Sequence, residues 1–189
     1  MENALIVSGT DNGIAFFTTL LGKASIRNIT ALKSASEAGR LMLERSFDLV
    51  LINAPLVDET GETLARRIAL RGVCPVILVV KSELFEAVSG VCEDDGVMTI
   101  AKPLNETVFW AALKLAKSTQ NRIRKMQDEN EKMKRQIEDI RIVDRAKYIL
   151  ISTTGMSEKE AHRHIEKQAM DTRTTKRAVA EEILKIYEN

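Results

Sequence analysis

The sequence predicts an α/β domain followed by an all-α segment, and three observations support this division. Over residues 1–112, short apolar runs alternate with amphipathic segments, as in a parallel sheet covered by helices on both faces. A helical pattern without Pro or Gly extends from about 113 to 150. Two shorter amphipathic segments follow it. We expect domains at 1–115 and 140–189, joined by a linker helix at 116–143.

The first domain is predicted to contain five units of strand and helix. Its continuous β-rich runs, with a weaker second one, are the expected strands 4–7, 25–31, 49–53, 76–80 and 97–100. The segments between them have helical periodicity, and they cover 12–22, 35–46, 59–72 and 83–92. A last helix begins after Pro103 and continues into the linker. Because parallel strands require crossover connections, this order predicts a doubly wound (βα)5 fold.

The linker helix has a narrow apolar stripe with the spacing of a coiled coil. With Ala116 and Thr119 as the first a and d positions, the stripe continues through a dimer seam of Ile123, Met126, Asn130, Met133, Ile137 and Ile140. A helix packed only on its own domain usually has a wider apolar face. An amide at an a position pairs best with the same amide of an in-register parallel helix, and Asn130 occupies such a position. We therefore expect a parallel homodimer, in which Glu129 faces Lys134 of the second chain.

The last segment is predicted to be a bundle of three helices. Gly155 suits the left-handed conformation that ends a helix, and Ser157 and Glu160 form a capping box for the next one. A third helix is expected to begin at Asp171 or Thr172. The expected core of the bundle contains apolar and small side chains from all three helices: Ala146, Leu150, Met156, Ala161, Ile165, Ala169, Met170, Val179, Ala180, Ile183 and Ile186.

Composition argues against several classes of protein. The chain has 28 basic and 27 acidic residues, and its only cysteines, Cys74 and Cys92, lie among apolar residues without a CxxC motif. Buried thiols in a reducing compartment are the simplest interpretation. Two histidines far from both cysteines do not suggest a metal site. No signal peptide or membrane span is apparent, so we expect a cytoplasmic protein without cofactors.

The ends of the predicted strands carry a recognisable pattern. Residues 48–55, the run 75–80 and the sequence Ala-Lys-Pro at 101–103 resemble a two-component receiver domain, and this resemblance covers roughly the first 115 residues. The resemblance implies a phosphorylation site at the strand ends, but most of its chemistry is missing. The positions of this degenerate site hold Ser8 and Gly9 for two metal-binding acids, Asn53 for the phosphoacceptor Asp, Val80 for Thr or Ser, and the retained Lys102.

These substitutions predict a domain that is not phosphorylated. A carboxamide is a much poorer nucleophile than a carboxylate, and Mg²⁺ prefers several hard oxygen ligands. Lys102 is then expected to form a local hydrogen bond, with Asn53 as the candidate acceptor. We expect a regulator rather than an enzyme, whose first domain dimerises or binds a regulatory protein. A phosphorylation switch through another acid, such as Asp48, is the disfavoured alternative.

The last segment resembles a second family more closely. Over about 140–188, it is similar to the ANTAR domain, the RNA-binding module of transcription antitermination regulators, in Ala146, Lys147, Leu150, 155–158, 160–162, Ile165, Ala169, Met170, Arg173, Val179 and Ala180. The resemblance implies binding to paired hairpins in a leader RNA, which prevents a terminator from forming. The alternative is a protein-interaction adaptor that binds no nucleic acid.

Charged and polar residues of this segment are the candidate RNA contacts. Arg173, Lys176 and Arg177 are expected in the first turn of the third helix, where a phosphate could also bind beside Thr174. His162 stands where the family usually has an aromatic ring, and it either stacks on an unpaired base or packs in the bundle. Lys147 and Arg163 complete the set.

Overall fold

The computed structural model describes residues 1–187 of the chain. It divides into two compact units, Met1–Lys125 and Met126–Asn189. Helix α5 (Glu106–Thr154) contributes to both units. Each unit is described by itself below.

The first unit contains a five-stranded parallel sheet. Its strands are β1 (Asn3–Ser8), β2 (Asn28–Leu32), β3 (Leu49–Asn53), β4 (Val76–Lys81) and β5 (Met98–Lys102), in the order β2-β1-β3-β4-β5. The connecting helices are α1 (Asp11–Lys23), α2 (Ala35–Glu44), α3 (Glu62–Leu70) and α4 (Ser82–Asp94). The predicted doubly wound α/β fold is therefore confirmed.

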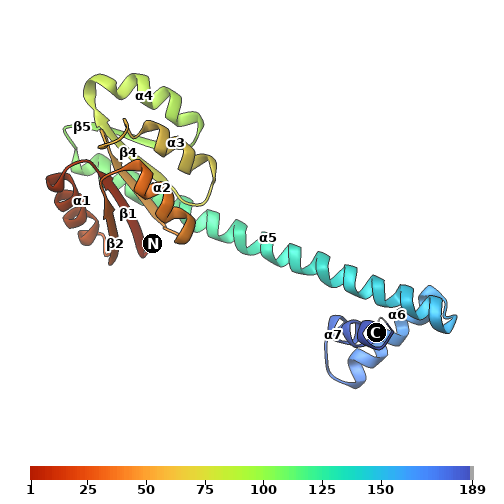
Figure 1. Cartoon of the computed structure of the whole chain (residues 1–189). Helices are drawn as coiled ribbons and strands as arrows, with labels where there is room; N and C mark the ends of the chain where they lie inside the picture. Colours follow the sequence, from red (N-terminus) through yellow and green to blue (C-terminus); the bar gives the residue numbers. More distant parts are fainter. Residues whose placement is uncertain (188–189) are drawn as a thin grey trace. The chain divides into compact units, whose positions relative to one another are not determined.

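Each face of the sheet has its own apolar core, because alternate strand residues point to opposite faces. One core joins the sheet to α2, α3 and α4, and the other joins it to α1 and the first turns of α5 (Figure 1). Leu5 and Ile6, neighbours in β1, belong to different cores and are both fully buried. The near-continuous apolar strands of the sequence follow from this burial on two sides.

Strand β2 begins later than predicted. Ser25 adopts a positive φ of 62°, and its backbone N–H donates to the carbonyl of Gly22 at the end of α1. The N–H of Ile26 donates to Leu21 in the same way. Residues 25 and 26 therefore close the helix, and ladder pairing with β1 starts at Asn28.

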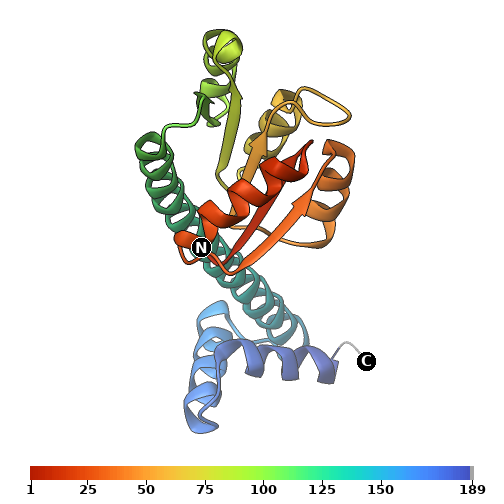
Figure 2. The same cartoon turned by 90° about the vertical axis from the view of Figure 1, so that its left-hand side faces the viewer.

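The second unit packs the end of α5 against α6 (Glu158–Asp171) and α7 (Lys176–Tyr187), as Figure 2 shows. Ala146, Leu150, Ala161, Ile165, Ala169, Val179, Ala180 and Ile183 are buried in its core. Gly155 has a φ of 75° after the end of α5, and Ser157 and Glu160 form the expected capping box. The predicted three-helix bundle is thus confirmed, with Met156 partly buried beside the core.

Three expectations for this unit were wrong. Helix α7 begins at Lys176 rather than at 171 or 172, because Thr172 caps α6 and its hydroxyl donates to the carbonyl of Gln168. Met170 and Ile186 are 78% and 71% exposed and lie outside the core. The buried face of α6 repeats every four residues through Ala169, so the side chain at 170 points about 100° away from it.

None of the helices described within residues 1–187 is both long and apolar enough to cross a membrane.

Candidate functional site

The degenerate phosphorylation site lies where β1 and β3 end. The side-chain amide of Asn53 donates to the hydroxyl of Ser8 over 2.9 Å. The buried Oδ1 of Asn53 accepts no hydrogen bond from residues 1–187. Lys102 donates to the carbonyl of Ala54 over 2.6 Å, so the expected bond from Lys102 to Asn53 is absent. Val80 is buried in the core and offers no hydroxyl.

Helix α1 closes over this position. A Cβ placed on Gly13 would lie 2.4 Å from the Ser8 hydroxyl and 2.5 Å from the Asn53 amide nitrogen. Thr10 caps the start of the helix, and its hydroxyl accepts the backbone N–H of Gly13. The neighbouring acid Asp11 forms an exposed ion pair with Lys33 at 2.8 Å. The only charged member of the expected set at this edge is Lys102, whose pKa is lowered by burial and by Lys81 nearby.

The alternative acid, Asp48, lies at the start of β3, at the opposite edge of the sheet. It accepts the backbone N–H groups of Glu2 and Asn3 and pairs with Arg124 at 2.6 Å. Burial alone would raise the pKa of Asp48, but these hydrogen bonds and the Arg124 charge outweigh it and lower the pKa. Asp48 therefore ties α5 at Arg124, about five turns from the start of the helix, to the edge of the sheet where β3 begins.

The apolar a and d residues predicted on α5 are buried at the start of the helix and exposed farther along it. Ala116 is fully buried in the core of the first unit, so it cannot open an intermolecular seam as expected. Ile123 is half-buried, whereas Met126, Met133, Ile137 and Ile140 are each more than half exposed, and Asn130 is exposed between them. These side chains are available to a second helix, and the homodimer stays a prediction.

Four of the candidate RNA contacts meet in one groove of the second unit. The groove has a volume of about 380 Å³ and lies among α5, α6 and α7. Lys147, His162, Lys176 and Arg177 line it, together with apolar side chains of α5. The bundle thus brings together residues that are 30 positions apart in the sequence.

Each cation of this groove already has carboxylate partners. Lys176 bonds to Glu166 on α6, and Arg177 pairs with Asp139 and with Glu181, each at 2.8 Å. These contacts lower the pKa of Glu166 and raise the pKa of Arg177.

Lys147 and His162 have acidic partners too. Lys147 pairs with Asp144 at 2.8 Å and with Glu158 at 3.1 Å, and these bonds raise its pKa. The half-buried ring of His162 lies 3.3 Å from Glu166. The positive charge of the groove is therefore largely neutralised within the bundle.

The remaining candidates lie outside the groove. Arg173 has a φ of 54° in the turn between α6 and α7, and the hydroxyls of Thr172 and Thr174 share a hydrogen bond beside it. The expectation that Arg173 belongs to the first turn of α7 was wrong, because Thr175 caps that helix by accepting the N–H of Ala178. Arg163 lines a separate groove of about 520 Å³.

The predicted candidate Arg163 belongs to a row of cations on α6 whose other members, Lys159 and Lys167, were not predicted. Lys159, Arg163 and Lys167 are exposed and recur every four residues, which places them on one face of the helix. Within residues 1–187, none of the three has a carboxylate partner, and the same holds for Arg173. The spacing of these cations was visible in the sequence, but their freedom from ion pairs was not. We call these three residues of α6, taken together with Arg173 in the turn that follows the helix, the free basic face.

Known proteins are similar to each of the two units. Residues 131–184 match the ANTAR domain. The chain is 28% identical over 137 residues to the transcriptional regulatory protein PdtaR of Mycobacterium tuberculosis H37Rv, covering 72% of this chain and 67% of that protein.

Solved structures resemble the first unit. The signal receiver domain of an HD domain-containing protein from Pseudomonas fluorescens Pf-5 has a TM-score of 0.57 at 22% identity, over 66% of this chain and 92% of the other. The receiver domain of a sensor histidine kinase from Pseudomonas aeruginosa PAO1 has a TM-score of 0.52 at 18% identity, over 62% and 98%. These likenesses show that the first unit has a receiver fold, and it precedes a segment that matches the ANTAR domain.

Proposed function

We propose that this chain is an RNA-binding regulator of transcription antitermination. The match of residues 131–184 to the ANTAR domain carries the proposal, and the similarity to a transcriptional regulatory protein supports it. In the proposed mechanism, the second unit binds small hairpins in a leader RNA and stabilises them. An overlapping terminator then fails to form, and transcription continues.

The charge distribution favours the free basic face as the first contact with RNA. Phosphates attract cations over a distance, and contacts to phosphate supply much of the affinity of such complexes. Lys176, Arg177 and Lys147 would first have to exchange an acidic partner for a phosphate. Arg163, Lys167 and Arg173 need no such exchange. We therefore assign the phosphate contacts mainly to these three residues, with the groove cations contributing after contact.

His162 remains the candidate for reading a base. Its ring is 44% exposed at the edge of the groove, and unpaired bases of RNA loops commonly stack on aromatic or imidazole rings. The Glu166 carboxylate holds one ring nitrogen, which fixes the orientation of the ring. A flat ring held in this way could stack on a loop base.

A parallel dimer would place two such domains on one transcript. The exposed seam from Met126 to Ile140 supports this part of the proposal, because apolar side chains at a and d positions gain stability when a partner helix covers them. Linking two RNA-binding domains raises the effective concentration of the second contact once the first has formed. Two hairpins on one leader would then be bound more tightly than either hairpin alone.

The first unit is proposed to act without phosphorylation. The Asn53 amide donates to the Ser8 hydroxyl, and residue 53 has no carboxylate that could accept a phosphoryl group. We infer that this unit contributes to dimerisation or binds a regulatory protein. Its surface, rather than a phosphoryl group, then carries the signal.

Binding to a leader RNA with two short hairpins tests the proposal. The Arg163→Gln/Lys167→Gln variant should bind about tenfold more weakly, and the slope of log affinity against log salt should fall by about one to two. A matched control is Arg122→Gln/Lys125→Gln, which removes an exposed Arg and Lys from α5 and should leave the affinity within about twofold.

The internally neutralised groove gives some support to the adaptor alternative. Ile140 and Val143 lie in it beside the paired charges, and such a mixed surface can also hold a protein helix. Failure of the folded dimer to bind RNA at low salt would overturn the RNA proposal and favour the adaptor. Binding that is equally lost in the control variant would reject the assignment to the free basic face.

A further inference from the structure

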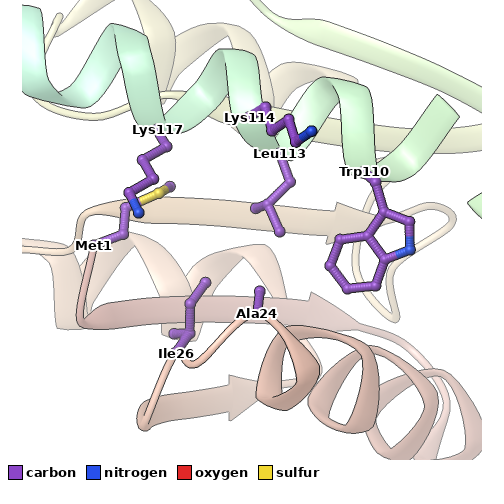
Figure 3. A pocket seen from close by; sticks show the side chains of 7 residues that line it. All are labelled: Met1, Ala24, Ile26, Trp110, Leu113, Lys114 and Lys117. Carbon is purple, nitrogen blue, oxygen red and sulfur yellow. The ribbon is translucent and has the colours of Figure 1, made fainter. Parts of the chain in front are cut away.

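The first unit has an apolar pocket that neither the receiver fold nor RNA binding uses. It has a volume of about 340 Å³ and lies between α5 and the turn that joins α1 to β2 (Figure 3). Leu113 points from α5 toward Ala24 and Ile26, which form the opposite wall. Met1 and Trp110 stand at the two ends. The walls are thus almost entirely apolar.

The charges at this pocket are of one sign. Lys114 and Lys117 line it from α5, and no acidic side chain lines it. Within the described residues neither lysine has an ion-pair partner, in contrast to the groove cations of the second unit. A ligand with an apolar body and one negative charge would complement both features.

We propose that this pocket binds a small amphipathic carboxylate. The apolar body lies between Leu113 and Ile26, and the carboxylate lies at the rim within reach of Lys114 and Lys117. Burial of apolar surface supplies most of the affinity, because ion pairs at an exposed rim contribute little each. The lysines then select an anion over a neutral or cationic compound of the same shape.

Size favours a small molecule over a protein partner. Pockets for small ligands usually have volumes from about 300 to 1,000 Å³, and this one lies at the lower end of that range. A ligand there would contact α5 on one side and the α1–β2 turn on the other. Its binding energy would stabilise that contact by mass action. Binding of such a ligand would give the first unit a signal that requires no phosphorylation. This binding does not depend on RNA binding by the second unit.

Trp110 provides a direct measurement, since it is the only tryptophan of the chain. Octanoate is titrated into the full-length protein while the emission of Trp110 is recorded. We expect a saturable change, at least about fivefold weaker binding of octanol, and no comparable binding of octylamine. The Lys114→Gln/Lys117→Gln variant should lose the preference for octanoate over octanol, whereas Arg122→Gln/Lys125→Gln should keep it.

A second variant tests the position of the ligand. Ala24→Leu fills the pocket and should weaken octanoate binding at least about tenfold, while circular dichroism reports whether the variant folds. The lysine variant alters only exposed side chains and keeps the test decisive if Ala24→Leu does not fold.

Three results would overturn the proposal. The first is that octanoate causes no saturable change in Trp110 emission, and the second is that octanol binds as tightly as octanoate. The third is that folded Ala24→Leu binds octanoate as tightly as the unchanged protein. A Trp110 signal that follows protein concentration instead of octanoate would assign the pocket to a second copy of the chain.

Discussion

The backbone of Gly13 lies directly against the side-chain amide of Asn53. A Cβ at residue 13 would approach the Asn53 Nδ2 atom to 2.5 Å, which is closer than real Cβ contacts allow. The first turn of α1 therefore rests on the hydrogen bond between Asn53 and Ser8. The close packing of the Ser8 and Asn53 side chains thus leaves no room for a side chain at residue 13.

Substitution of Gly13 tests this packing. Gly13→Ala should destabilise the protein by about 1 to 3 kcal/mol, because the new methyl group overpacks a closed site. Gly22→Ala is the matched control in the same helix, since a Cβ there meets nothing within 4 Å. It should be neutral or stabilising by up to about 1 kcal/mol. Urea denaturation of both variants measures the difference, and equal stabilities would show that the Gly13 contact is loose.

Restoring the phosphoacceptor should not restore phosphorylation. Asn53→Asp supplies a carboxylate, but Ser8 and Gly9 still offer no acid for Mg²⁺. After incubation with acetyl phosphate and Mg²⁺, the intact mass of the Asn53→Asp variant should stay unchanged. A stable added phosphate would mean that the domain is closer to an active receiver than we infer.

The ion pair between Asp48 and Arg124 predicts a pH dependence of stability. Because the folded-state pKa of Asp48 is below its usual value of 3.8, the charged carboxylate stabilises the protein above about pH 4. This contribution is lost as the pH falls through the folded-state pKa. Arg124→Gln should therefore cost roughly 1 kcal/mol at pH 7 and less near pH 3.

Urea denaturation at the two pH values measures this change. Arg122→Gln, an exposed arginine on the same helix, is the control and should change the free energy of unfolding by less than about 0.5 kcal/mol. An equal loss for Arg124→Gln at pH 7 and pH 3 would show that packing of the arginine, rather than its charge, stabilises α5 on the sheet.

The seam on α5 predicts a specific crosslink. In a parallel, in-register dimer the two copies of residue 130 face each other, so Asn130→Cys should form a disulfide between chains under mild oxidation. Both natural cysteines are buried and should not compete. Asp128→Cys, two residues away on the outer face, is the control. Non-reducing electrophoresis measures the products, and equal crosslinking of both variants would reject the predicted register.

Local patterns in the sequence determined the elements and the fold class. The apolar runs and helical periods of residues 1–112 predicted all five strands, because a strand buried on both faces must be apolar throughout. Gly155 and the capping box of Ser157 marked the end of one helix and the start of the next. The identities of Ser8, Gly9, Asn53 and Val80 predicted a domain without the chemistry of phosphorylation. These features depend on the residue itself and on its neighbours along the chain, and both can be read directly from the sequence.

Only the tertiary structure decided which side chains meet. Lys102 donates to Ala54 rather than to Asn53, and Lys176 is held by Glu166 of another helix. The pocket beside Trp110 arises because α5 and the α1–β2 turn come together from distant parts of the chain. Such pairs depend on how helices are rotated and spaced, and many rotations satisfy the same periodic pattern. The sequence therefore predicted where charge and apolar surface occur, and packing determined which of them remain free to bind.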